Sequence, residues 1–410
     1  MRLVLVVPRF PLVSETFIVN KFVGLIDCGW DAHIVCMQTY PEKWDDFPPL
    51  AGRHELRDRV HQEWPHEARW MAALLWLPVL LLTFLRAPRN TRRYWQDCRP
   101  RFGRGTLKRF YLDARIIALQ PDILHFEFGA LAVERLYLKD ALGCRLSVSF
   151  RGYDLNYVGL DDPDYYAALW QTVDAVHVLG RDLWRRALNR GCPADMPYAL
   201  IPPAIDVGFF KRSGAAEQEA SGTTGRPLRI LSVGRLEWKK GYEYALGAVR
   251  QLNERGQDFE YHIIGDGAYL EPLTFMRYES GLEDRVQFLG AQPHAQVMEA
   301  MKWADVLLHA SVSEGFCNAV LEAQAMGLPV VVSDADGLGE NVDDGRTGFV
   351  VPRRDPAALA DRLAVLAGDA NLRHEMGAAG RARVENCFSL DRQIADFDRF
   401  YSEMKPRHAH

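Results

Sequence analysis

The chain has 410 residues, more than one hydrophobic core usually holds, so we expect two domains. Its 48% hydrophobic and 25% charged residues are ordinary for a soluble globular enzyme. The formal net charge of -5 gives no basis for binding nucleic acid, and we expect no such partner.

The cysteine pattern and the first residues indicate the compartment. Seven cysteines are scattered along the chain, and none forms a Cys-x-x-Cys pair. This pattern is typical of a reducing compartment and of a protein without a structural metal. Residues 1–8 carry one basic residue and an apolar run too short for a secretory signal. We therefore predict a first buried strand and a cytoplasmic protein.

Short β-branched runs alternate with longer helical patterns along the chain. The expected strands of the first half are Leu3–Val7, Ala32–Met37, Ile123–Phe126, Leu146–Phe150 and Ala175–Leu179. Those of the second half are Ile230–Val233, Tyr261–Ile264, Val286–Leu289, Val306–His309 and Val330–Ser333. Near-continuous apolar runs separated by helices are typical of parallel sheets covered on both faces. Two such sets predict an α/β fold with two doubly wound, Rossmann-like domains.

One segment of the first half breaks this alternation. Residues 70–85 are apolar except for Thr83, and Pro78 in the middle is expected to kink a helix. This run is slightly too short to span a bilayer. Residues 86–115 then hold ten Lys or Arg against two Asp. We interpret 70–115 as an insertion that contacts an anionic membrane surface; the alternative is a buried helical hairpin with a solvated basic face.

The domain boundary is expected near residue 205. Ile201-Pro202-Pro203 ends the first set of strands, and residues 211–227 have the Ser, Gly, Ala, Thr and Glu content of a linker. The expected parts are a first domain in 1–205, a second in 206–389, and in 390–410 an amphipathic helix that could pack anywhere, including back across the first domain.

The stretch Ser313-Glu314-Gly315-Phe316-Cys317-Asn318 follows an expected strand, and we expect it to begin a helix. Gly315 permits a tight turn, and the free N–H groups of the helix start would point at a ligand above the sheet. Eight residues on a helix return to nearly the same face, so Glu314 and Glu322 are expected to reach one elongated ligand. Two carboxylates suit the diols of a sugar; the alternative is a surface helix with two solvated glutamates.

Glycine turns follow three other expected strands. They are Gly234-Arg235 with Lys240 downstream, Gly265-Asp266-Gly267, and Asp336-Gly337-Leu338-Gly339. Cations at the carboxyl end of a parallel strand suit a diphosphate and would stabilise charge on a departing nucleotide. A lone glycine turn is weak support. Four at successive strand ends, with two cations and two carboxylates, predict a nucleotide-sugar site.

The order of these motifs (Gly-Arg-Leu…Lys-Gly, Gly-Asp-Gly, Glu-x7-Glu, Gly-Leu-Pro-Val-Val) resembles the family-four retaining glycosyltransferases of the GT-B fold. The resemblance implies that the two domains face each other across a cleft. The resemblance covers essentially the whole second domain and implies a nucleotide-diphospho-sugar donor, held without a metal or a cofactor. It implies Arg235 and Lys240 on the diphosphate, Glu314 with the amides of Phe316, Cys317 and Asn318 on the hexose, Glu322 on the ribose, and Gly234 and Gly265 beside the donor. Asp336 and Gly339 depart from the family's usual Gly and Pro.

The turn after the first strand carries Pro11-Leu12-Val13-Ser14-Glu15-Thr16-Phe17. It resembles the Pro-x-x-Ser-Glu-Thr-Phe opening of the colanic-acid and exopolysaccharide branch of this family. We expect Ser14, Glu15 and Thr16 on the acceptor side of the cleft; the alternative is that Ser14 or Thr16 only caps the next helix.

Two further motifs depart from this branch. In His125-Phe126-Glu127-Phe128-Gly129, Glu127 replaces a histidine, and in Ser149-Phe150-Arg151-Gly152-Tyr153-Asp154, Arg151 replaces another. We predict that Glu127 and Arg151 form an ion pair, and we assign both, with His125 and Asp154, to the acceptor side. The alternative for His125 is a core histidine satisfied by a backbone partner.

The sequence therefore predicts a retaining, metal-independent glycosyltransferase at the inner face of the cell membrane. It would move a hexose-type unit to a lipid-linked or growing saccharide acceptor in cell-surface polysaccharide biosynthesis. The expected catalytic residues are Arg235, Lys240 and Glu314. Two alternatives are a nucleotide-sugar epimerase, which needs no acceptor, and a catalytically silent donor-binding scaffold of an assembly complex.

Overall fold

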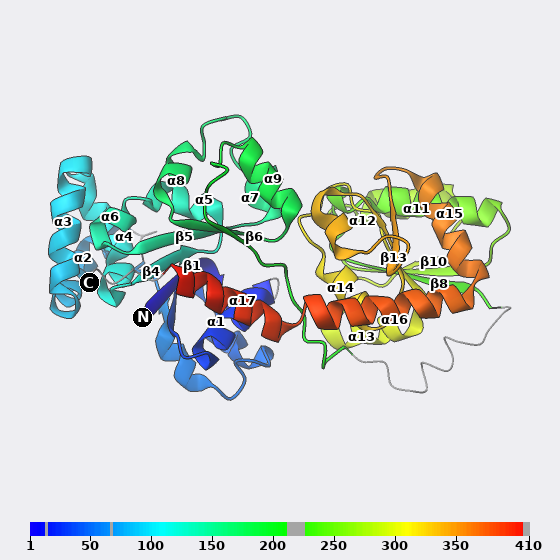
Figure 1. Cartoon of the computed structure of the whole chain (residues 1–410), viewed down its shortest axis with the longest axis horizontal. Helices are drawn as coiled ribbons and strands as arrows, with labels where there is room; N and C mark the ends of the chain where they lie inside the picture. Colours follow the sequence, from blue (N-terminus) through cyan, green and yellow to red (C-terminus); the bar gives the residue numbers. More distant parts are fainter. Residues whose placement is uncertain (13–14, 66–68, 211–225, 405–410) are drawn as a thin grey trace. The chain divides into compact units, whose positions relative to one another are not determined.

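The computed structural model describes residues 1–12, 15–65, 69–210 and 226–404. Contacts divide the chain into two compact units. The first unit comprises Met1–Leu179, Leu183–Ile201 and the chain from Gln393 onward, and the second comprises Gly180–Asp182 and Pro202–Arg392. Each unit is built on one parallel sheet with helices on both faces (Figure 1).

The first unit has seven strands in the order β3-β2-β1-β4-β5-β6-β7. The strands are β1 (Arg2–Phe10), β2 (Asp31–Thr39), β3 (Val60–Gln62), β4 (Ile123–Phe126), β5 (Arg145–Phe150), β6 (Ala175–Val178) and β7 (Tyr198–Leu200). The helices are α1 (Thr16–Asp27), α2 (Arg69–Arg86), α3 (Pro88–Phe102), α4 (Gly105–Leu119), α5 (Gly129–Ala132), α6 (Leu138–Leu142), α7 (Gly152–Asn156), α8 (Ala167–Thr172) and α9 (Arg181–Asn189).

The second unit has six strands in the order β10-β9-β8-β11-β12-β13. The strands are β8 (Leu228–Val233), β9 (Phe259–Ile264), β10 (Val286–Phe288), β11 (Val306–His309), β12 (Val330–Ser333) and β13 (Gly348–Val351). The helices are α11 (Tyr242–Glu254), α12 (Leu270–Glu279), α13 (His294–Trp303), α14 (Asn318–Ala325), α15 (Pro356–Gly368) and α16 (Ala370–Cys387).

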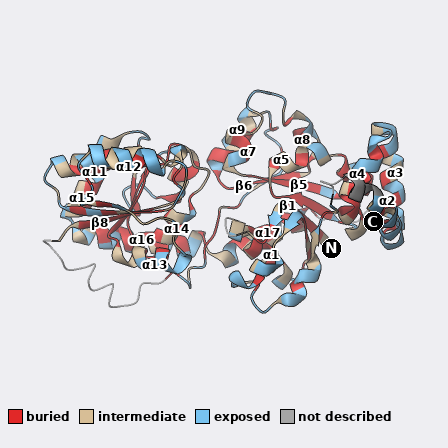
Figure 2. Ribbon diagram, turned by 180° about the vertical axis from the view of Figure 1, so that it is seen from behind, coloured by how far each residue is buried: buried red, intermediate tan, exposed pale blue. Residues whose placement is uncertain are grey.

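The burial of the strands explains why the apolar runs in the sequence predicted them. Every residue of β4, β6, β11 and β12 is buried, as expected where helices cover both faces of a parallel sheet (Figure 2). All ten expected strands exist, with ends shifted by a few residues. The three short strands β3, β7 and β13, which pattern alone did not indicate, lie at the edges of the sheets.

The last helix, α17 (Leu390–Glu403), packs on the first unit although it follows the second in sequence. Phe397, Phe400 and Tyr401 are buried in the same core as residues of β1 and α1. The indole N–H of Trp30 donates to Asp398 at 2.8 Å. The apolar face of α17 is therefore buried against the first unit.

The segment that was expected to kink at Pro78 is a single helix, α2, which continues through this proline. It packs on α4, while α3 packs on α4 and α6. None of the helices among the described residues is long and apolar enough to cross a membrane.

Candidate functional site

The donor-side residues follow four neighbouring strands of the second sheet. The turns after β9, β8, β11 and β12 carry them, and these strands are adjacent in that order. The sheet order reverses between β8 and β11, and such a switch point is where ligands bind in open α/β sheets. Lys240 follows β8 and Glu314 follows β11, so these two residues lie on either side of the switch point.

Two glycines let the neighbouring turns touch. Gly234 and Gly265 have φ values of 156° and 149°, and a Cβ at Gly265 would overlap the carbonyl of Gly234. The N–H of Gly265 donates to Gly290 O at 2.9 Å. Gly265 therefore needs glycine for this backbone contact, and Gly234 needs it for its positive φ.

The loop after β8 is held firmly against the end of β11. Gly241 has φ +62°, and a Cβ there would overlap the carbonyl of Ala310. The N–H of Val312 donates to Lys239 O at 2.7 Å. This close approach brings the ammonium of Lys240 onto Oε2 of Glu314.

Lys240, Glu314 and His309 form a charged cluster. His309 Nε2 lies 3.6 Å from the Glu314 carboxylate. Burial would raise the pKa of Glu314, but Lys240 and His309 outweigh it and lower the pKa to about 2. Burial would lower the pKa of His309, but Cys317 and Glu314 raise it to about 9. Glu314 also raises the pKa of Lys240 against the effect of burial. All three are therefore charged at neutral pH.

Sequence reasoning missed His309, although a histidine ending an apolar strand was a usable signal. Its Nε2 lies 3.4 Å from Cys317 Sγ and 2.9 Å from Ser311 Oγ. His309, Glu314 and Cys317 each offer one ligand atom, all within 4.8 Å of one another, a spacing at which a metal ion could bind. Lys240 already bonds Oε2 of Glu314, the oxygen 3.6 Å from His309 Nε2, so a metal would compete with an ammonium group for this carboxylate.

Asp336, a departure from the family pattern, has a clear role. Its Oδ2 accepts from Ser313 Oγ at 2.6 Å and from the N–H of Glu314 at 3.2 Å. Its Oδ1 accepts from Arg353 at 3.0 Å. Asp336 therefore fixes the backbone that carries Glu314.

The expectation that Glu314 and Glu322 share one helical face is wrong. Helix α14 begins at Asn318, so Glu314 lies in the loop before it and only Glu322 is helical. Glu322 lies 3.7 Å from His294 instead and raises the pKa of that histidine. The eight-residue periodicity therefore does not relate the two carboxylates.

One of the three amides assigned to the hexose is already engaged. The N–H of Cys317 donates to Asn341 Oδ1 at 3.3 Å, and Asn341 Nδ2 donates back to Cys317 O at 2.9 Å. This pair anchors the start of α14. Phe316 and Asn318 flank Cys317, and their amides remain the candidates for a ligand at the helix N-terminus.

Arg235 does not join the charged cluster. Its side chain is 70% exposed and pairs with Glu237 at 2.8 Å. The structure thus separates the two expected phosphate cations, Lys240 inside the cluster and Arg235 at the surface.

The acceptor-side residues belong to three adjacent strands of the first sheet, whose order reverses between β1 and β4. Glu15 and Thr16 follow β1, His125 and Glu127 lie in and after β4, and Arg151 and Asp154 follow β5. Ser14 lies outside the described residues. Thr16 is exposed and is the first residue of α1, whose N-cap is Glu15 without a side-chain cap bond. Capping by Thr16 is therefore not seen. Glu15 Oε2 is buried without a partner among the described residues, and burial raises the pKa of this carboxyl.

His125 belongs to the core. Both ring nitrogens lie 2.8 Å from serine hydroxyls, Nδ1 from Ser147 and Nε2 from Ser149. Ser149 continues to His177, which reaches Ile201 O at 2.8 Å. Burial lowers the pKa of His125 well below its usual value, so the ring is neutral. The alternative role as a satisfied core histidine fits this placement, with hydroxyl partners in place of a backbone one.

The predicted ion pair between Glu127 and Arg151 is confirmed, with Nη2 3.1 Å from Oε2. Sequence reasoning missed its third member, Lys21, whose Nζ lies 2.7 Å from Glu127 Oε1. Lys21 falls on the apolar face of α1 with Ile18 and Leu25, which was the available signal. Burial lowers the pKa of Lys21 to about 8 although Glu127 opposes this.

Asp154 connects two turns of the first unit. Its carboxylate accepts from the N–H of Ala130 and from the N–H of Arg151, each at 3.1 Å. Burial raises its pKa to about 6. Asp154 therefore positions the backbone around Arg151 and is itself fully buried.

Comparison with known proteins bears on the family and the fold of the chain. The family model described as glycosyl transferases group 1 matches residues 215–383. Two solved structures share the fold: a glycosyltransferase from Rickettsia africae (TM-score 0.72, 17% identity, 99% of each chain) and an Anabaena protein in complex with UDP-glucose (TM-score 0.70, 16% identity, 98% of this chain and 100% of that one). These matches confirm the predicted two-domain GT-B fold.

Two curated relatives match along most of the chain. The amylovoran biosynthesis glycosyltransferase of Erwinia amylovora is 30% identical over 97% of this chain and 98% of its own length. A putative colanic acid biosynthesis glycosyltransferase of Salmonella typhimurium is 30% identical over 87% of this chain and 88% of its own. The chain therefore belongs to the group 1 glycosyl transferases.

Proposed function

We propose that the chain transfers a hexose-type unit from a nucleotide-diphospho-sugar to a lipid-linked or growing saccharide acceptor, with retention of anomeric configuration and without a metal. The observation that carries this proposal is the contact of Lys240 with Glu314 across the switch point of the second sheet. The names of the two relatives place them in amylovoran biosynthesis and, putatively, in colanic acid biosynthesis, which supports a role in exopolysaccharide biosynthesis.

The charged cluster suits the bond changes of the reaction. The bond from the anomeric carbon to the diphosphate oxygen breaks, and a bond from that carbon to an acceptor hydroxyl oxygen forms. The departing diphosphate takes the electron pair and receives the proton of the acceptor hydroxyl. Lys240 would stabilise the charge that grows on the diphosphate, and Glu314 would hold hydroxyl groups of the sugar.

Metal independence rests on where the cations are. A divalent ion near a diphosphate commonly supplies positive charge, and Lys240 with protonated His309 already supplies it beside Glu314. EDTA is therefore expected to leave transfer unchanged. A loss of activity restored by Zn²⁺ would instead assign His309, Glu314 and Cys317 to a metal.

On the acceptor side, we propose Glu15 as the residue that meets the acceptor. Of the acceptor-side carboxylates, Glu15 has a buried oxygen, Oε2, without a partner among the described residues, whereas Glu127 is occupied by Lys21 and Arg151. An acceptor hydroxyl would satisfy Glu15 Oε2. The membrane as the place of reaction is part of the same proposal, because the acceptor would be lipid-linked.

The test is transfer from labelled UDP- and GDP-sugars to a lipid-linked saccharide fraction, with NMR of the new anomeric centre. Glu314→Ala is expected to lower the rate by about 10²–10³. Glu299→Ala, which removes an exposed glutamate of the same unit, is the matched control. Wild-type turnover by Glu314→Ala would contradict the proposal. Conversion of the donor without an acceptor would indicate an epimerase, and donor binding without transfer a scaffold.

A further inference from the structure

Helix α2 has an apolar side that the fold buries. Val79 is buried with Tyr111 and Ala114 of α4, and Leu75 and Trp76 pack against them. The indole N–H of Trp76 donates to Leu107 O at 3.2 Å. This side alone would account for an ordinary amphipathic helix.

The other side of α2 is also apolar, and it is exposed. We call it the apolar stripe: Leu74, Leu77, Leu81, Leu82 and Leu85. Their exposed fractions lie between 43% at Leu82 and 70% at Leu74. The spacing of 3, 4, 1 and 3 residues keeps them on one face of the helix, and Pro78 on the same face is exposed too. Single exposed leucines need no explanation, but a contiguous row of five marks a binding surface.

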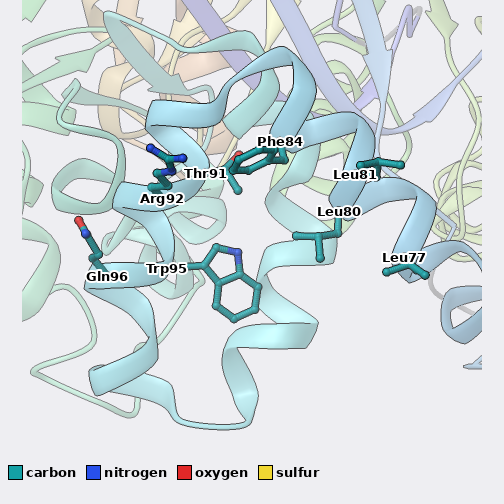
Figure 3. Close-up of a pocket in the computed structure, with 8 residues that line it drawn as sticks. All are labelled: Leu77, Leu80, Leu81, Phe84, Thr91, Arg92, Trp95 and Gln96. Atoms are coloured by element: carbon teal, nitrogen blue, oxygen red, sulfur yellow. The ribbon is translucent and has the colours of Figure 1, made fainter.

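The apolar surface continues from α2 onto α3 through a groove (Figure 3). Leu77, Leu80, Leu81 and Phe84 form the α2 wall, and Trp95 of α3 faces them. Arg92 lines the same groove, with its guanidinium 5.7 Å from the centre of the Phe84 ring. The groove is thus lined mainly by apolar side chains and also by one cation, Arg92.

The surroundings of the stripe are basic. The exposed basic side chains of this region are Arg86, Arg89, Arg92, Arg93, Arg99, Arg101, Arg104 and Lys108. Asp97 and Asp140 both pair with one of them, Arg101. Asp113 is buried, accepts hydrogen bonds from Tyr94 and Tyr137, and has its pKa raised by burial. The acidic residues therefore neutralise little of this charge.

We propose that α2 and α3 form a docking surface for an anionic lipid bilayer, with the apolar stripe lying in the membrane interface and the arginines on lipid phosphates. The inference deepens the proposed function, because it rests on an acceptor held in a membrane. Leucines on one face with flanking arginines have the chemistry that interfacial helices use. A second copy of the chain fits poorly, since its equivalent surface would bring the same positive charges together.

The test is flotation of the full chain with vesicles of phosphatidylcholine alone or with 30% phosphatidylglycerol. The wild type is expected to bind the anionic vesicles about tenfold or more better, with binding reduced in 1 M NaCl. Leu77→Ser with Leu81→Ser is expected to lower binding about tenfold or more. Leu160→Ser, which removes an exposed leucine elsewhere in the first unit, is the matched control and should bind as wild type.

A charge variant separates the contribution of the arginines to vesicle binding from that of the leucines. Arg86→Glu with Arg89→Glu should abolish the preference for anionic vesicles, whereas Arg346→Glu, an exposed arginine of the second unit, should not. Equal binding of the leucine double variant, or equal binding to both kinds of vesicle, would overturn the proposal. Dimers in light scattering that the leucine substitutions abolish would assign the stripe to a second copy instead.

The outcome is independent of the chemistry proposed for the other unit. Glu314→Ala should float with anionic vesicles as the wild type does while losing transfer. The leucine double variant should keep its thermal unfolding temperature and its donor binding, because the replaced side chains are exposed. Loss of vesicle binding by Glu314→Ala would therefore count against the docking surface and not against the transferase.

Discussion

Each unit of the molecule holds a Lys–Glu ion pair at the switch point of its sheet, and the two pairs differ in their access to water. Lys21 and Glu127 in the first unit are 1% and 0% exposed. Lys240 and Glu314 in the second are 12% and 16% exposed. Both pairs have a third charged partner, Arg151 in the first case and His309 in the second.

The environments of the pairs explain what each can do. Lys21 lies 4.0 Å from the centre of the Phe397 ring of α17, so the first pair ties α1, β4 and the last helix together. Removing one partner of such a pair leaves a buried charge, which is far costlier than breaking a surface pair. The second pair lies in the turns that follow β8 and β11 and is partly exposed, which is the setting that the proposed binding of a donor requires. A similar pair of residues is thus structural in one unit and is the proposed ligand-binding pair in the other.

The largest expected effect is a loss of stability when the buried pair in the first unit is broken. Glu127→Gln leaves Lys21 and Arg151 without their carboxylate and should lower the free energy of unfolding by about 3–5 kcal/mol. Asp361→Asn, which removes one partner of the exposed pair with Arg255, should change it by less than about 1 kcal/mol. Urea unfolding followed by circular dichroism measures both. Equal losses in the two variants would remove the distinction between buried and accessible pairs.

Next in size is the catalytic effect of the accessible pair. Lys240→Met removes the cation proposed for the diphosphate and should lower kcat by about 10²–10³. Its unfolding free energy should fall less than that of Glu127→Gln, because water can reach Glu314. Steady-state kinetics measures this, with Lys302→Met, which removes a partly exposed lysine paired with Glu299, as the control. A stability loss as large as that of Glu127→Gln, with activity retained, would make Lys240 a structural residue.

The pH dependence of stability distinguishes the accessible carboxylate. The pKa of Glu314 is about 2 in the folded chain against its usual 4.5. Its stabilising contribution is therefore fully present above pH 4.5 and is lost as the pH falls towards 2. Wild type should exceed Glu314→Gln in unfolding free energy by on the order of 2–3 kcal/mol at pH 6, and the gap should close towards pH 2. A gap that stays constant with pH would show that Glu314 is not held as a carboxylate by Lys240 and His309.

The smallest effect concerns Arg235, the cation at the surface. Its charge lies in water of high dielectric constant, so its attraction to a diphosphate is weaker than that of Lys240. Arg235→Ala should lower kcat/KM by about threefold to tenfold and leave the unfolding free energy within about 0.5 kcal/mol. A loss equal to that of Lys240→Met would show that Arg235 joins the cluster when the donor binds.

The sequence predicted the strands and the location of the donor-side turns well. Carboxyl ends of parallel strands meet at one edge, so motifs that follow β8, β9, β11 and β12 had to lie near one another. The relation of Glu314 to Glu322 could not be obtained in this way, since it depended on where α14 begins. That start is fixed by Asn341, which is 24 residues away from Cys317.

Contacts between segments far apart in the sequence could not be predicted either. Lys21 and Glu127 are 106 residues apart, and no motif contains both. The pattern of α17 predicted an amphipathic helix, but its partners Val19 and Phe22 have the same apolar character as many other core residues. For the same reason, periodicity showed that residues 70–85 are apolar and could not show which side of the helix stays uncovered.

Pro78 has a consequence for the depth at which α2 would rest in a bilayer. Proline has no N–H, so the carbonyl of Leu74, four residues earlier, lacks its usual helical donor. In hydrocarbon an unsatisfied carbonyl costs several kcal/mol, whereas water among lipid headgroups satisfies it. Since Pro78 lies on the same exposed side as the apolar stripe, the missing amide hydrogen would restrict a membrane-bound α2 to the hydrated layer of the membrane.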